Sequence, residues 1–199
     1  MFWDSASLLY DLFEHFYNHK SYVGTGLMVE REIEYGDDVL ECACGTGGIS
    51  VYICKKSGHL VATDFSVGML KQTAWKLRHN HNAIVRKADM TKLKCRDDRF
   101  DKVVAGNVIH LLDDPELAVR ELVRVCKVGG KVIIPTYINM YNGKTGFIVK
   151  FIGKAGAKFK RQFDLRSYMK FFEDAGYTDV EYHVVKGRIP CAIAVITKH

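Results

Sequence analysis

The chain of 199 residues has no apolar run near the roughly 20 residues that a membrane-spanning helix needs. Its first residues, M-F-W-D-S-A-S, include an acid where a secretory signal peptide would carry basic residues. Three prolines are too few for a linker-rich or disordered chain. We therefore expect one folded domain located in the cytoplasm.

Paired cysteines are also scarce. The six cysteines lie singly in apolar stretches, apart from Cys42-x-Cys44, whose spacing is too short for the usual zinc pairs. We expect buried free thiols and no metal site. The net charge of +6 is modest and can steer anionic ligands without identifying any of them.

Apolar segments of strand length alternate with longer helical patterns along residues 39–136. The patterns predict strands at 39–42, 59–63, 83–87, 101–106 and 131–136, and helices at 49–58, 67–79 and 115–126. Strands separated by helices indicate a parallel sheet. The clearest helix start is at Asp114 and Pro115, because aspartate caps free amides and proline fits the first helical position. Gly129 and Gly130 are expected to turn the chain back.

The two ends of the chain depart from this alternation. Residues 8–34 predict one or two amphipathic helices, with a break between Gly24 and Gly26. A helix is expected from Asp164 through Phe172, followed by a hairpin of strands 179–185 and 189–197. The predicted fold class is α/β: a doubly wound, Rossmann-like, mostly parallel seven-stranded sheet with a C-terminal antiparallel hairpin and helices on both faces.

A glycine-rich turn follows the first predicted strand, in V-L-E-C-A-C-G-T-G at residues 39–47. Such a turn lets backbone amides approach a ligand, whether a phosphate or a dinucleotide. Glu41 distinguishes between the possible ligands, because a carboxylate at the strand end attracts a cationic ligand and repels a pyrophosphate. The dinucleotide pattern G-x-G-x-x-G also fails, since Ser50 replaces its last glycine, and the Walker lysine is absent.

Two further acids follow the next predicted strands. Asp64 in V-A-T-D-F-S lies about twenty residues past the glycines, where a Rossmann-type sheet presents a carboxylate to ribose hydroxyls. Read alone, Asp64 could equally be a helix cap. In K-A-D-M, Asp89 could accept a hydrogen bond from an adenine amino group while Met90 packs on the ring.

The order of five segments resembles the class I S-adenosylmethionine-dependent methyltransferases, and more closely their small ubiquinone/menaquinone-biosynthesis-like, type 11 branch. The segments are E-C-A-C-G-T-G, A-T-D-F-S, K-A-D-M, F-D-K-V-V-A-G-N-V-I-H-L-L and V-C-K-V-G-G-K-V-I-I. The resemblance covers roughly residues 8–136 and implies S-adenosylmethionine as cofactor and S-adenosylhomocysteine as product. From the resemblance we expect a single domain, 1–199, with four parts: a helical cap (1–36), a cofactor-binding half (37–136), a lid insertion (137–163) and a C-terminal helix and hairpin (164–199).

The resemblance also implies a set of cofactor-binding residues. Those around the methionyl part are Glu41, Cys42, Ala43, Gly45, Thr46 and Gly47. Those around the ribose and adenine are Asp64, Phe65, Met69, Asp89 and Met90, while Asn107 and Val108 lie beside the transferable methyl group. Tyr10, in the pair Tyr10-Asp11, would close over the cofactor. The family usually has glycine where this chain has Ala43, and we expect alanine there to keep a β-region φ.

The acceptor side is less defined by the sequence. His110 follows the fourth strand, where it could act as a base or orient the acceptor. Residues 137–163 mix aromatic and basic side chains, which suits a small amphiphilic or anionic acceptor. Methyl transfer is expected to be an in-line displacement that depends mainly on alignment.

Two rival functions stay open at this point. The first is an RNA or other nucleic-acid methyltransferase, which the absence of N-P-P-Y and D-P-P-Y disfavours. The second is a non-catalytic S-adenosylmethionine-binding protein. We expect the protein to be a monomer or a homodimer.

Overall fold

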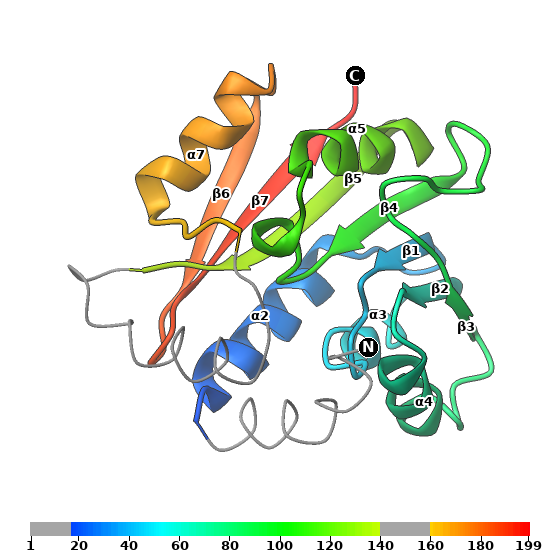
Figure 1. Cartoon of the computed structure of the whole chain (residues 1–199). Coiled ribbons are helices and arrows are strands. Elements are labelled where there is room, and N and C mark those ends of the chain that lie inside the picture. Colours follow the sequence, from blue (N-terminus) through cyan, green and yellow to red (C-terminus); the bar gives the residue numbers. More distant parts are fainter. Residues whose placement is uncertain (1–16, 140–159) are drawn as a thin grey trace.

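The computed structural model describes residues 17–139 and 160–199. Within them, seven strands form one sheet in the order β3-β2-β1-β4-β5-β7-β6 (Figure 1). The strands are β1 (Asp38–Cys42), β2 (His59–Asp64), β3 (Ala83–Lys87), β4 (Phe100–Ala105), β5 (Cys126–Tyr137), β6 (Val180–Val185) and β7 (Cys191–Thr197). Pairing is parallel from β3 to β5, and β7 is antiparallel to both β5 and β6. The predicted sheet and C-terminal hairpin are confirmed.

Helices cover both faces of the sheet. They are α2 (His19–Glu32), α3 (Ser50–Ile53), α4 (Val67–Lys76), the 3-10 helix η1 (Ile109–Leu111), α5 (Pro115–Val125) and α7 (Leu165–Asp174). Figure 1 shows α5 and α7 on one face and α2 on the other. Two separate clusters of buried apolar side chains fill the two layers, one under α5 and α7 and one under α2, α3 and α4. This is the doubly wound arrangement.

The helix caps expected from the sequence are present. Asp114 accepts a hydrogen bond from the amide of Leu117 at 2.8 Å, and Pro115 occupies the first turn of α5. Asp164 begins α7 with a reciprocal capping box to Ser167. Such caps satisfy amides that have no partner within the helix.

The expected break between Gly24 and Gly26 is wrong, because α2 runs without interruption from His19 to Glu32. These glycines allow close packing instead. A Cβ on Gly24 would lie 2.5 Å from Val185, and one on Gly26 would lie 2.3 Å from the ring of Tyr52. Glycine therefore lets α2 lie close against β6 and the residues of α3.

The expected turn at Gly129 and Gly130 is also wrong, since β5 begins at Cys126 and passes through both glycines. The amide of Gly129 and the carbonyl of Gly130 instead pair with the backbone of Lys198, at 2.7 and 3.0 Å. Gly129 has a φ of 77° and absorbs the irregularity of the strand.

Five of the six cysteines are buried and all six are unbonded thiols, in agreement with the expectation of buried free thiols; Cys95 is half-buried. Among residues 17–139 and 160–199, no helix is long and apolar enough to cross a membrane. The same residues contain no group of three or more His, Cys, Asp or Glu side chains arranged to hold a metal ion.

Candidate active site

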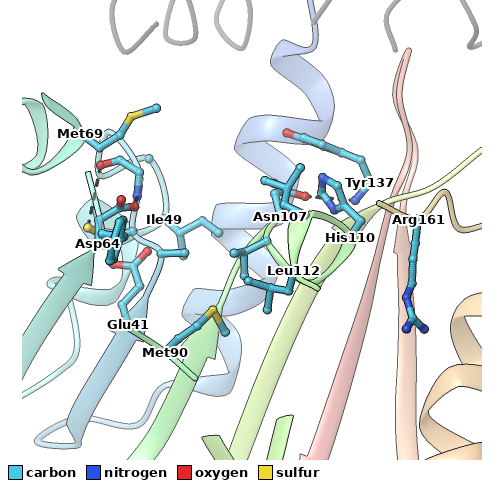
Figure 2. Close-up of a pocket in the computed structure, with 18 of the residues that line it drawn as sticks. Glu41, Ile49, Asp64, Met69, Met90, Asn107, His110, Leu112, Tyr137 and Arg161 are labelled. Atoms are coloured by element: carbon cyan, nitrogen blue, oxygen red, sulfur yellow. Dashed lines mark hydrogen bonds between the residues drawn. The ribbon is translucent and has the colours of Figure 1, made fainter. Parts of the chain in front are cut away.

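A cavity of about 680 Å³ lies at the carboxyl ends of the parallel strands (Figure 2). Its walls come from the loops that follow β1, β2, β3, β4 and β5, with contributions from α2 and from residues 161–163. Open α/β sheets bind their ligands in this crevice, because the strand order reverses there between β1 and β4.

The loop after β1 turns through three left-handed residues. Ala43, Gly45 and Gly47 have φ angles of 53°, 56° and 83°. The expectation of a β-region φ at Ala43 is therefore wrong: the chain must reverse directly after Cys42, and alanine is held in a conformation that favours glycine. The carbonyl of Gly45 accepts a hydrogen bond from the Thr73 hydroxyl at 2.7 Å, which fixes the loop against α4.

Asp64 connects this loop to the loop after β2. Its Oδ2 accepts from the amide of Gly45 at 2.9 Å, and its Oδ1 accepts from the amide of Ser66 at 2.8 Å. The side chain is half-buried and lines the cavity. The structure thus gives Asp64 a loop-holding role at the same time as it presents the carboxylate to the cavity.

Glu41 lies at the base of the cavity beside Asp64 (Figure 2). The residue is only 1% exposed, and its carboxylate accepts a hydrogen bond from the Ser50 hydroxyl. Burial, together with the nearby charge of Asp64, raises the pKa of Glu41 to about 8. A cationic group placed against this carboxyl would favour its ionised form, so the site suits a ligand that carries positive charge.

The loops after β2 and β3 add apolar side chains to the cavity next to their acids. Met69 and Met90 are buried, while the ring of Phe65 is half exposed with the Lys87 ammonium 4.9 Å from its centre. The exposed Asp89 accepts hydrogen bonds from the amide and hydroxyl of Thr91. All four side chains that the sequence assigned to the adenine line the cavity: Phe65, Met69, Asp89 and Met90.

The turn after β4 lines the cavity between the side of Asp64 and the side of Arg161 (Figure 2). Asn107 has a φ of 54°, and its Oδ1 accepts from the amide of Tyr137 at 3.1 Å. His110 is 8% exposed, and burial lowers the pKa of its ring to about 4. Its carbonyl accepts from the amides of Lys160 and Arg161, so the turn also holds the segment that follows residue 159.

Most of the predicted residues line the cavity, with three exceptions. Cys42 is fully buried in the core, and Gly47 faces Thr73 of α4; neither is among the lining residues. Tyr10 lies outside the described residues. The central part of the predicted lid insertion, 140–159, lies outside them as well.

The sequence did not single out the residues of α2 that reach the cavity. Thr25 is 2% exposed and lines the cavity, and its hydroxyl has no hydrogen-bond partner within the described part of the chain. Tyr22 of the same helix and Ile189, from the turn between β6 and β7, also line the cavity. A buried hydroxyl that faces a cavity without a partner is suited to a polar ligand atom.

The fold and the two acids beside the glycine loop define a Rossmann-like methyltransferase. Residues 40–134 match the methyltransferase domain family. A ubiquinone/menaquinone biosynthesis C-methyltransferase of Bdellovibrio bacteriovorus is 31% identical over an alignment of 179 positions, and the alignment covers 77% of this chain and 75% of that protein. The chain belongs to this family: it is an S-adenosylmethionine-dependent methyltransferase, and S-adenosylmethionine is its cofactor.

Two further comparisons agree. A demethylmenaquinone methyltransferase of Staphylococcus saprophyticus is 26% identical over an alignment of 185 positions, and the alignment covers 82% of this chain and 79% of that protein. The crystal structure of an S-adenosylmethionine-dependent methyltransferase of Thermotoga maritima superposes with a TM-score of 0.77 at 19% identity, over 99% of both chains. The latter likeness concerns the fold.

Proposed function

We propose that this methyltransferase transfers the methyl group to a small amphiphilic or anionic acceptor by in-line displacement. The observation that carries the proposal is that one continuous cavity has two unlike halves. One half contains the acids Glu41 and Asp64, and the other has a group of apolar side chains among its polar residues. The apolar side chains of this second half are those of Val108, Leu111, Leu112, Leu117, Ile138 and Phe163.

The acidic half fits S-adenosylmethionine, because its ammonium and sulfonium cations match the carboxyls of Glu41 and Asp64. In the proposal, Glu41 and the loop from Ala43 to Thr46 hold the methionyl part. Asp64 holds the ribose, and the residues around Met69 and Met90 enclose the adenine. The sulfonium supplies the methyl group, so the protein needs to provide chiefly alignment, which can be worth roughly 7–11 kcal/mol.

Asn107, Val108 and His110 are proposed to lie between the two halves, beside the methyl group. With a pKa of about 4, the His110 ring is neutral at physiological pH and is a weak base. We therefore propose that it orients the acceptor. Two relatives support a small acceptor, since one is named a C-methyltransferase of quinone biosynthesis and the other a demethylmenaquinone methyltransferase.

Binding and transfer can be tested separately. S-adenosylhomocysteine should raise the melting temperature in proportion to the logarithm of its concentration, and NAD should not. Stabilisation by NAD alone would contradict the cofactor assignment. Asp64→Ala should lose most of the S-adenosylhomocysteine effect.

The acceptor class requires S-adenosylmethionine with a labelled methyl group. Incubated with a small-molecule extract and with total RNA in parallel, the enzyme should place label in the solvent-extractable fraction of the first mixture. Salt-sensitive labelling of RNA would favour the nucleic-acid alternative. Tight cofactor binding without transfer to either fraction would favour a non-catalytic binding protein.

A further inference from the structure

Arg161 is the only lysine or arginine among the described residues that line the cavity. The ionisable acids of the lining are Glu41, Asp64, Asp89, Asp113 and Asp114. Figure 2 places Arg161 on the far side of His110 and Tyr137 from Glu41 and Asp64. Because burial keeps His110 neutral, the guanidinium is the one positive charge that these walls offer to an acceptor.

The backbone beside Arg161 is held firmly at the cavity wall. We refer to residues 160–163 as the strap. The amides of Lys160 and Arg161 both donate to the carbonyl of His110, at 3.1 and 3.2 Å. The carbonyl of Phe163 accepts from the amide of Asn139 at 2.8 Å, and its buried ring packs against the rings of α7. The strap therefore sets the position of Arg161 relative to the turn after β4.

The side chain of Arg161 is only weakly engaged. Its Nη1 lies 3.2 Å from Oε1 of Glu116, and the two side chains are 42% and 35% exposed. An ion pair at such exposure contributes little stability, and a guanidinium has five N–H donors. An anionic methyl acceptor can therefore bind Arg161 in two ways: it shares the guanidinium with Glu116, or it displaces Glu116 from the guanidinium.

The space around the Arg161–Glu116 pair can accommodate a substituent of the methyl acceptor. Arg161 and Phe163 line both the cavity and a neighbouring hollow of about 270 Å³, whose walls include Glu116 and residues of α7. Arg161 thus lies where the two spaces adjoin. A planar carboxylate or another delocalised anionic oxygen is the partner that guanidinium recognises best, because it can accept two parallel hydrogen bonds.

We propose that Arg161 is a specificity-determining residue that selects acceptors bearing an anionic oxygen, and that this oxygen competes with the Glu116 carboxylate for the guanidinium. The inference rests on the proposed function, since it assigns the second half of the cavity to the acceptor. It narrows the acceptor class to anionic molecules and names the side chain that recognises the charge.

Two probes of the same ring size separate charge from shape. Binding of 2-naphthoate and of neutral 2-naphthalenemethanol is measured by calorimetry on the full chain saturated with S-adenosylhomocysteine. The wild type should bind naphthoate several-fold more tightly than the alcohol. Arg161→Gln should weaken naphthoate binding about tenfold and leave the alcohol unchanged, which would remove the preference. Arg166→Gln, the same charge change on an exposed residue outside the cavity lining, should leave the preference intact.

Glu116→Gln provides a test of opposite sign. Removing the competing carboxylate should strengthen naphthoate binding a few-fold. If the Arg161–Glu116 pair were purely structural, both Arg161→Gln and Glu116→Gln would weaken naphthoate binding. A wild type without a preference for the anion, a preference that survives Arg161→Gln, or equal weakening by both substitutions would each overturn the proposal. S-adenosylhomocysteine binding is read independently in every variant, so failure of the cofactor assignment is distinguished from failure of the Arg161 assignment.

Discussion

The carboxylate of Asp64 accepts a hydrogen bond from the backbone amide of Gly45 at 2.9 Å, so the end of β2 holds the glycine loop that follows β1. Its other oxygen accepts from the amide of Ser66. One side chain thereby organises two loops at the edge of the cavity. A ribose hydroxyl would meet a carboxylate that these two amides already hold in a fixed orientation.

Asp64→Ala should therefore weaken S-adenosylhomocysteine binding about 10–100-fold, because a hydrogen bond to a charged group contributes about 1.5–3 kcal/mol. The free energy of unfolding should fall by only about 1 kcal/mol, since the site is half-buried and water can satisfy the released amides. Calorimetry and urea unfolding measure the two quantities. Asp179→Ala, at an acid with an 82% exposed side chain, is the control and should change neither. Equal losses in binding and stability would make Asp64 a structural residue that only holds the two loops.

Ala43 offers a test of the loop conformation. With a φ of 53°, alanine bears a steric cost that glycine avoids. Ala43→Gly should therefore raise the free energy of unfolding by about 1 kcal/mol, despite the greater freedom of glycine in the unfolded chain. The comparison variant is Ala88→Gly, in a loop residue whose φ is not positive, where the same change should destabilise the protein. Destabilisation by both substitutions would contradict a left-handed Ala43.

Sequence reasoning succeeded where the determining contacts are local. Glu41 and Asp64 end successive strands beside a glycine turn, and parallel strands bring such ends together. The break expected at Gly24 and Gly26 is wrong for the opposite reason: these glycines make room for distant residues of β6 and α3, and the local sequence does not reveal those contacts.

The same limit hid part of the cavity wall. Thr25 reaches the site only because α2 packs across the sheet, and Ile189 because the final hairpin folds back beside it. Neither residue belongs to a motif. The expectation of a β-region φ at Ala43 was wrong for a simpler reason: the sequence indicates a tight turn but does not specify which of its residues takes a positive φ.

The buried Thr25 hydroxyl leads to a prediction of opposite effects on stability and binding. Thr25→Val keeps the shape of the side chain and removes a polar atom that has no partner within the described residues. The protein without ligand should gain about 1 kcal/mol of unfolding free energy, whereas affinity for S-adenosylhomocysteine or for the acceptor should fall. The matched variant Thr73→Val should destabilise the protein, because that hydroxyl donates to the carbonyl of Gly45. Destabilisation by Thr25→Val would show that its hydroxyl already has a structural partner.

Glu41 should make stability depend on pH. Its pKa is raised from the ordinary value of 4.5 to about 8, mainly by burial. Between these values the folded chain holds a proton that the unfolded chain has lost, so this contribution to stability is full below 4.5 and is lost as pH rises towards 8. Glu41→Gln should flatten the decrease in unfolding free energy over that interval. An unchanged slope in urea titrations would show that Glu41 is ionised in the folded protein.

Cofactor binding should be linked to the same proton. A cation bound against Glu41 favours its carboxylate, so binding near neutral pH should release a proton and strengthen as pH rises towards 8. Calorimetry in buffers of different ionisation enthalpy measures this release. The Glu41→Gln variant should release none from this group, and release of the same size in the variant would assign the proton to another residue.

His110 yields the prediction that separates orientation from base catalysis. Burial lowers its pKa from 6.5 to about 4, so between these values the unfolded chain binds the proton and the folded chain does not. Stability should therefore increase with pH across this interval, and His110→Gln should reduce the increase. If the ring only orients the acceptor, the variant should lower kcat at every pH and leave the shape of the kcat/KM profile unchanged. Loss of an ionisation from that profile on substitution would instead identify His110 as the base.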